Sequence, residues 1–169
     1  MLAIAGKDGH VYGIDRGRLA GVFKTPATTI ENADAPVTSP PTTRTCPGAL
    51  GGGQFNGTSY HPGLGALYVG MVDFCAYFWK DVGPLFDFSV QPRGWITAMD
   101  ADTGRVLWRY RADAQVQAGL VPTKSGLLFA GDTHGNLLAL DAQSGAVLHR
   151  LDVQGALNHG LISRRGPHE

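Results

Sequence analysis

The sequence has little cysteine, no excess of either charge and no long apolar run, and each absence excludes a class of protein. Its 169 residues include 14 basic and 14 acidic ones, so no bulk charge is available to hold a nucleic acid or a membrane surface. No apolar run reaches the roughly 20 residues that a transmembrane helix needs. Two cysteines, Cys46 and Cys75, are too few to indicate a redox compartment.

Sequence motifs of several common chemistries are also absent. The chain has no P-loop, no Gly-x-Ser-x-Gly and no His-Glu-x-x-His, and without Cys-x-x-Cys-His it attaches no c-type haem. Its start shows no signal peptide and reads directly as structure. Four aspartates lack the alternating spacing of a calcium loop, so we expect no metal ligand among them: Asp73, Asp100, Asp132 and Asp141.

What the sequence does have is 24 glycines and an internal repeat. The stretch GWITAMDADTGRVLWRY (94–110) matches GNLLALDAQSGAVLHRL (135–151) at 8 of 17 positions, each offset by 135 − 94 = 41 residues. Each copy reads as a strand, a turn rich in Asp and Gly, and a second strand. A period near 41 is typical of repeats in which each unit is one sheet that cannot bury itself alone.

Other stretches extend the repeat in both directions. GHVYGID spaces Gly9 from Asp15 as the first copy spaces Gly94 from Asp100, and 94 − 9 = 85 is about two periods, so a middle unit is expected near residues 50–80. We therefore predict an all-β chain that forms a single partial β-propeller domain over residues 1–169, with about three to four four-stranded antiparallel blades. The repeat units are expected around 9–23, 58–90, 94–130 and 135–163, the first and last being incomplete. Because a propeller closes to protect its edges, we expect the chain to be part of something larger.

A long irregular segment, 24–57, interrupts the repeat and carries five of the ten prolines. So long a segment indicates a binding, lid or interface role. It ends in CPGALGGGQFNG, where glycines permit close approach of a backbone and Gln54, Phe55 and Asn56 offer two amides and an aromatic face. These groups suit a flat polar cofactor. The alternative is a glycine-rich turn between blades.

Ala98, Asp100, Gly104 and Trp108 form the pattern Ala-x-Asp-x-x-x-Gly-x-x-x-Trp. It is similar to the tryptophan-docking motif of the quinoprotein alcohol dehydrogenases, which depend on pyrroloquinoline quinone (PQQ). With the Cys-Pro-Gly-Ala-Leu-Gly-Gly segment and the long loop, the resemblance covers residues 3 to 160 and corresponds to the C-terminal part of that family's eight-bladed propeller. It implies that Trp108 locks one blade to the next. His149 replaces this tryptophan in the second copy, and near Asp15 the nearest substitutes are Phe23 and Val22.

The resemblance also implies a site. Residues that face PQQ in the family fall by position on Gln54 and Phe55, with Asn56 close by, and on Gln117 and Asn158. In the complete enzymes a Ca²⁺-bound quinone accepts a hydride from the alcohol or sugar while an Asp takes the hydroxyl proton. That Asp and the Ca²⁺ ligands lie upstream of this segment, so no catalytic residue is expected here.

The resemblance implies a periplasmic location, although the chain shows no export signal. In an exported protein Cys46 and Cys75 could form a disulfide between the loop and the following strand. The vicinal cysteine pair that stacks on PQQ in the family is missing.

Two functions stay open. The chain is either a C-terminal fragment or subunit of a PQQ-dependent dehydrogenase oxidising alcohols or sugars, or a non-catalytic propeller scaffold for protein binding or assembly. In the first case it contributes one wall of the PQQ site, and its partners are the remaining blades or a second chain. The long loop favours this dehydrogenase. The absent catalytic part and the His149 substitution keep the scaffold open, and with it the question of whether the chain is an enzyme.

Overall fold

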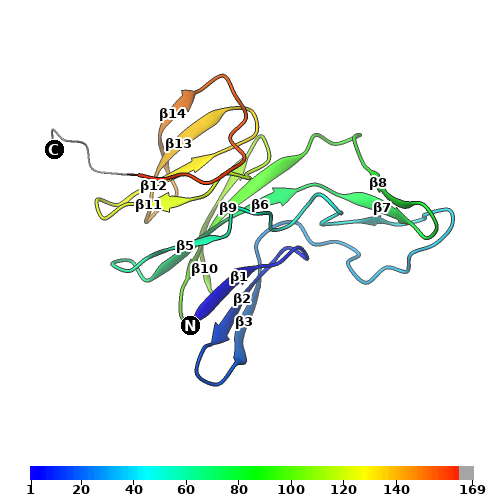
Figure 1. The fold of residues 1–169 in the computed structure, drawn as a ribbon, viewed down its shortest axis with the longest axis horizontal. Coiled ribbons are helices and arrows are strands. Elements are labelled where there is room, and N and C mark those ends of the chain that lie inside the picture. The colour runs from blue at the N-terminus through cyan, green and yellow to red at the C-terminus, as the bar shows by residue number, and fades with distance from the viewer. Residues whose placement is uncertain (164–169) are drawn as a thin grey trace.

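The computed structural model describes residues 1–163 and is all-β, as predicted. Its strands form four antiparallel sheets (Figure 1). The first sheet contains β1 (Leu2–Ala5), β2 (His10–Asp15) and β3 (Ala20–Pro26). The second contains β5 (Thr58–His61), β6 (Ala66–Asp73), β9 (Arg93–Asp100) and β10 (Val106–Ala112). The third contains β11 (Val121–Pro122), β12 (Leu127–Gly131), β13 (Asn136–Asp141) and β14 (Val147–Asp152).

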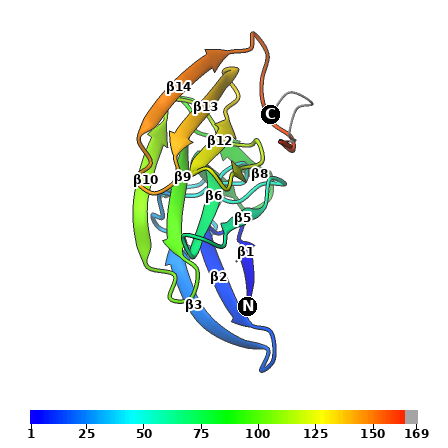
Figure 2. The ribbon, with the colours of Figure 1, turned by 90° about the vertical axis from the view of Figure 1, so that its left-hand side faces the viewer.

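A fourth, side sheet contains β4 (Arg44–Thr45), β7 (Ala76–Trp79) and β8 (Gly83–Phe86) and projects away from the other three. The first, second and third sheets follow one another in that order (Figure 2). Their inner strands meet, since β5 contacts both β1 and β11. Within the described part of the chain, no helix is long and apolar enough to cross a membrane.

The Asp–Gly turns of the repeat have the expected local structure. The Asp100 carboxylate accepts hydrogen bonds from the backbone N–H and the hydroxyl of Thr103, and Asp141 does the same with Ser144. These hydroxyls, more than any other group, lower the pKa of both carboxyls. Gly104 and Gly145, four residues after each Asp, have φ of 71° and 76°, a region that glycine enters without strain.

The core lies between the sheets and not within them. One apolar cluster joins the second sheet to the third, and another joins the first sheet to the second. Tyr68 is fully buried in the first of these clusters, and its hydroxyl donates to the carbonyl oxygen of Ala142 at 2.9 Å. Since each sheet buries a face only against its neighbour, no sheet is stable as a separate unit.

Trp108 of β10 crosses from the second sheet to the third. Its Nε1–H donates to the carbonyl oxygen of Ala142 at 3.1 Å, and its ring centroid lies 5.9 Å from that of Tyr68. The ring covers Gly145 so closely that a Cβ there would lie 2.5 Å from Trp108 Cε3. Position 145 therefore requires glycine for two reasons, the positive φ and the indole above it.

Phe23 of β3 takes the same place between the first and second sheets, where its ring covers Gly104. Thr25 supports the contact by donating to the carbonyl oxygen of Gly104 at 2.9 Å. Of the two residues that the sequence left open, Phe23 makes the contact, because Val22 lies at the bulge of β3 and is half exposed. His149 of β14, the third member of the series, is exposed.

The prediction of a separate middle unit is wrong. Residues 58–90 do not form a sheet of their own: β5 and β6 pair with β9 and β10, and β6 lies beside β9 from Ala66↔Asp100 to Asp73↔Arg93. The distance of 85 residues is one period of 41 plus 85 − 41 = 44 inserted residues. The insertions are the long loop after β3 and the segment 74–92, which forms most of the side sheet. The expected units 94–130 and 135–163 also differ from the observed sheets in the strands that they group. The repeat predicts the spacing of the sheets but not the strand at which each sheet begins.

Candidate functional site

Two of the sequence-predicted site residues occupy one structural position in the second and third sheets. Leu67 and Leu128 are equivalent, since each follows the residue that pairs with the turn aspartate. Their partners on the inner strands are Tyr60 and Pro122. Phe55 and Gln117 each lie five residues before this partner. Asn158, after β14, follows Gln117 by the 41 residues of the sequence repeat.

These positions lie in a continuous row that we call the inner rim, formed by residues 54–57, 116–119 and 157–160. The amide of Asn56 donates to the carbonyl oxygens of Ala118, at 3.3 Å, and of Gly70, at 3.2 Å. Further along, the Gly119 N–H donates to the carbonyl oxygen of His159 at 2.9 Å. The structure thus brings residues from three distant parts of the chain to one edge of the stacked sheets.

The five predicted residues divide into two groups by their contacts. Gln54 donates both amide hydrogens to its own turn, to the carbonyl oxygens of Leu50 at 2.8 Å and Gly51 at 3.1 Å, and the Asn56 amide is also engaged with backbone. Phe55 is fully exposed and Asn158 is exposed. Gln117 is half-buried and donates to the side chain of Gln115 at 2.9 Å.

The glycines before Gln54 have a structural explanation. The Gly53 N–H donates to the carbonyl oxygen of Gly6 at 2.9 Å, and a Cβ on Gly53 would lie 2.8 Å from the carbonyl oxygen of Ala5. Gly52 has φ of 73° and packs against the backbone of Lys7. The close approach that the sequence indicated is therefore made by the first sheet itself, and it fixes the turn that presents Phe55.

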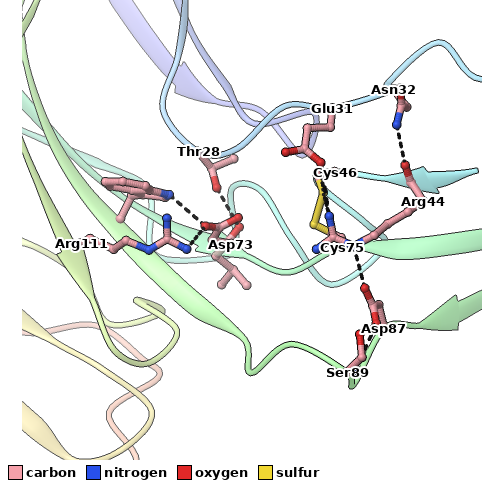
Figure 3. Close-up of a disulfide and its surroundings, with 12 residues drawn as sticks. Thr28, Glu31, Asn32, Arg44, Cys46, Asp73, Cys75, Asp87, Ser89 and Arg111 are labelled. Carbon is pink, nitrogen blue, oxygen red and sulfur yellow. Dashed lines mark hydrogen bonds and ion pairs between the residues drawn. A yellow bond between two sulfur atoms is a disulfide. The ribbon is translucent and has the colours of Figure 1, made fainter.

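A second polar region surrounds the disulfide that joins Cys46 to Cys75 (Figure 3). Arg44 pairs with Asp87, Nε to Oδ2 at 2.6 Å, and with Glu31, Nη1 to Oε2 at 3.2 Å. The Ser89 hydroxyl, and after it the Arg44 guanidinium, lowers the pKa of the Asp87 carboxyl. This network ties the long loop to the segment that follows β6.

Asp73 lies nearby, at the end of β6, and is bound by side chains of β9 and β10. Its Oδ2 accepts from Arg111 Nη2 at 2.9 Å and from Trp95 Nε1 at 3.1 Å, while the Arg111 guanidinium lies 4.7 Å from the Trp95 ring centroid. Both networks border a cavity of about 220 Å³. Neither arginine was predicted, because Arg44 pairs with residues of two separate insertions and Arg111 pairs with a residue on another strand of the sheet. Among residues 1–163, no group of three or more His, Cys, Asp or Glu side chains is arranged to hold a metal ion.

Known proteins similar to this chain include quinoprotein alcohol dehydrogenases of Pseudomonas. Over 122 residues, 66% of the chain, it is 28% identical to lupanine 17-hydroxylase (cytochrome c) of Pseudomonas sp. Over 133 residues, 69% of the chain, it is 25% identical to the quinoprotein alcohol dehydrogenase PedE of Pseudomonas putida. The solved quinohemoprotein alcohol dehydrogenase ADHIIG of Pseudomonas putida HK5 aligns with 91% of the chain at a TM-score of 0.74 and 15% identity, which shows a common fold.

The chain is a propeller segment like that of the PQQ-dependent alcohol dehydrogenases. It spans about a fifth of the length of the two curated relatives, 18% and 20%, and matches 28% of the solved chain. A family model described as outer membrane protein assembly factor BamB matches residues 92–166 of this quinoprotein-like segment, which include β9 to β14.

Proposed function

We propose that this quinoprotein-like segment forms one wall of the PQQ site in a dehydrogenase that oxidises alcohols or sugars. The observation that carries the proposal is the inner rim, where Phe55 and Gln117 hold equivalent positions before the inner strands of two successive sheets and Asn158 follows in the same row. An aromatic ring beside two amides suits a flat molecule with polar edges. The quinoprotein names of the relatives support the same cofactor.

The contacts within the rim assign different roles to the five residues. Phe55 offers its exposed ring as a face for the cofactor, and the amides of Gln117 and Asn158 lie in the same row toward its polar edges. Gln54 and Asn56 have their amide hydrogens engaged by backbone carbonyls, so they act by holding the rim in place. Three residues are thus available for direct contact with PQQ, where the sequence predicted five, and they fit the cofactor in part.

When bound, PQQ supplies a quinone that accepts the hydride of the substrate. The contribution proposed for this chain is binding and orientation, with Ca²⁺ and the base that takes the proton held by other blades or by a second chain. The Cys46–Cys75 disulfide supports an oxidising compartment such as the periplasm.

The test is equilibrium binding of PQQ, with and without Ca²⁺, to the chain and to Phe55→Ala. Because Phe55 is fully exposed, its truncation should leave the unfolding midpoint unchanged and weaken binding at least severalfold. Phe88→Ala is a control for loss of an aromatic ring outside the rim, since Phe88 is largely exposed and its ring lies 5.6 Å from that of Phe74 beside the side sheet. Equal binding by Phe55→Ala and the parent chain would contradict the rim as the contact surface.

The second candidate function is a scaffold that binds proteins without a cofactor. The match of residues 92–166 to a model described as an assembly factor favours it, as does β14, every residue of which is exposed. A folded chain that fails to bind PQQ at any Ca²⁺ concentration would support this candidate over the dehydrogenase.

A further inference from the structure

The polar cavity beside the disulfide is separate from the proposed PQQ site. It has a volume of about 220 Å³ and lies where the long loop, the segment 74–92 and the second sheet meet. It shares no lining residue with the inner rim, and all the residues that line it lie in the interior of the sequence, between Thr29 and Arg111. Its volume corresponds to about seven water molecules, which suits a small metabolite.

Two arginines lie at opposite ends of the segment Asp73–Cys75, all of which lines the cavity (Figure 3). Arg111 pairs with Asp73 and defines one end, which we call the Arg111 end. Arg44 lies at the other, which we call the disulfide end, where its Nη1 is 3.3 Å from Cys46 Sγ. Two steps of extended chain span about 7 Å, which sets the order of the distance between these charged ends.

The Arg111 end offers hydrogen-bond donors to an anion. Arg111 uses Nη2 for Asp73, and its guanidinium lies 4.7 Å from the Trp95 ring centroid, which holds the group in place. Within residues 1–163, its Nε and Nη1 donate to no further group. Asp73 Oδ2 is already occupied, because it accepts from both Arg111 and Trp95. Spare N–H groups on a guanidinium held in this way suit a carboxylate.

The disulfide end carries an excess of negative charge. Arg44 is shared there by two carboxylates, Asp87 and Glu31, so two anions face one cation. Both oxygens of Asp87 are occupied, since Oδ1 accepts from Ser89 and Oδ2 from Arg44. Glu31 Oε1 accepts from no group in the described part of the chain. This free oxygen and the excess charge suit a primary ammonium group.

Apolar residues line the cavity between its two ends. Phe74, which stands between Asp73 and Cys75 in the sequence, is one of them, and Val90 is another. Phe74 is buried, and its ring stacks on that of Phe86 at a centroid distance of 5.9 Å. A chain of methylene groups that joins the two ends would therefore lie against apolar surface.

We propose that this cavity binds an unbranched ω-amino acid, with its carboxylate on Arg111, its ammonium group on Glu31 and its methylene chain along the apolar lining. A dicarboxylate would place a second anion beside Glu31 and Asp87, and a diamine would place a cation beside Arg111. An α-amino acid carries both charges on one carbon and is too short to reach both ends. The proposal does not depend on PQQ.

The ligand class is tested by isothermal titration calorimetry of the full chain with four compounds. 5-Aminopentanoate should bind at least about tenfold more tightly than valine, its isomer with both charges on one carbon. It should exceed by the same factor pentanoate, which lacks the ammonium group, and pentylamine, which lacks the carboxylate. No saturable binding of 5-aminopentanoate, or binding no tighter than that of any of the other three, would overturn the proposal.

The place of binding is tested with Glu31→Gln, which keeps the size of the side chain and removes its charge. The Glu31 side chain is 53% exposed, so the unfolding midpoint should not change. The variant should bind 5-aminopentanoate severalfold more weakly and pentanoate no more weakly, because pentanoate makes no ammonium contact. Asp34→Asn is the matched control, since Asp34 is an exposed acidic residue of the same loop outside the lining. Equal affinity of Glu31→Gln and the parent chain for 5-aminopentanoate would overturn the assignment.

A polypeptide that ends in lysine presents an ammonium group and a carboxylate at a similar spacing. Nα-acetyl-lysine is the probe for this source, since its acetyl group stands in for the preceding residue. The cavity's volume favours the smaller free amino acid, so Nα-acetyl-lysine should bind more weakly than 5-aminopentanoate. Tighter binding of Nα-acetyl-lysine would identify a protein terminus as the ligand and would contradict the proposal.

Discussion

Gly145→Ala should destabilise the chain more than any other addition of a single methyl group at an Asp–Gly turn of the third sheet. Two costs combine at this position. The φ of 76° is unfavourable for a residue with a Cβ, by about 1–2 kcal/mol. The added Cβ would also lie 2.5 Å from Trp108 Cε3, and overpacking of this kind costs about 1–3 kcal/mol. We expect a total of about 2–5 kcal/mol in the free energy of unfolding.

Gly126→Ala is the matched control. Gly126 has φ of 86° and lies in a turn of the same sheet, but a Cβ there would meet nothing within 4 Å. Only the backbone cost applies, so its loss should be about 1–2 kcal/mol.

The assay is urea denaturation of four chains: the parent, Gly145→Ala, Trp108→Ala and the double variant. Trp108→Ala alone should cost about 3 kcal/mol, the low end of the range for a large aromatic, because Trp108 is only partly buried. With the indole gone, Gly145→Ala should cost no more than Gly126→Ala, so the two substitutions should couple by about 1–3 kcal/mol. Additive effects, or equal losses for Gly145→Ala and Gly126→Ala, would refute the contact between the second and third sheets.

Two further predictions concern the disulfide and the turn aspartates. Replacing both Cys46 and Cys75 with Ala should lower the free energy of unfolding by about 3–4 kcal/mol, as expected for a disulfide that closes a loop of 29 residues. Reductant should likewise lower the urea midpoint of the parent chain. An unchanged midpoint would contradict the disulfide. Since the folded pKa values of Asp100 and Asp141 are lowered, their contribution to stability is present above the ordinary carboxyl pKa of about 3.9 and is lost as pH falls through the folded values. The Asp100→Asn, Asp141→Asn double variant should therefore lose less stability between neutral and strongly acidic pH than the parent, and parallel curves would contradict this.

The repeat could be predicted from the sequence because local chemistry determines it. An Asp that accepts from its own turn, followed by a glycine with positive φ, appears as the same letters at Asp100 and Asp141. The ring four residues after Gly104, Trp108, covers the glycine of the next turn, Gly145. The first turn lacks this glycine, because the residue four after Asp15 is Leu19, which has φ of 52°.

The grouping of strands could not be predicted in the same way. Pairing of β6 with β9 bridges the inserted segment 74–92, and a distance of 85 residues suits two periods as well as one period with insertions. The side sheet was missed because β4 has two residues and carries no pattern.

The candidate site was predicted in its position more than in its contacts. The sequence indicated the turn of Gln54, Phe55 and Asn56, but it could not show that the two amides would be engaged by backbone carbonyls. The pairing of Arg111 with Asp73 reaches across β9, which lies between β10 and β6 in the sheet, and no motif marks it.

The measurement that tests the central claim most directly is a titration of the purified chain with PQQ in the presence of Ca²⁺, followed by quinone absorbance and thermal unfolding. The claim predicts saturable binding. At a hundred times the Kd, binding to the folded state alone adds about 2.7 kcal/mol, which for a chain of this size raises the Tm by about 5–10 °C. A folded chain with an unchanged Tm and no saturable absorbance change would contradict the claim that its inner rim is a wall of a PQQ site.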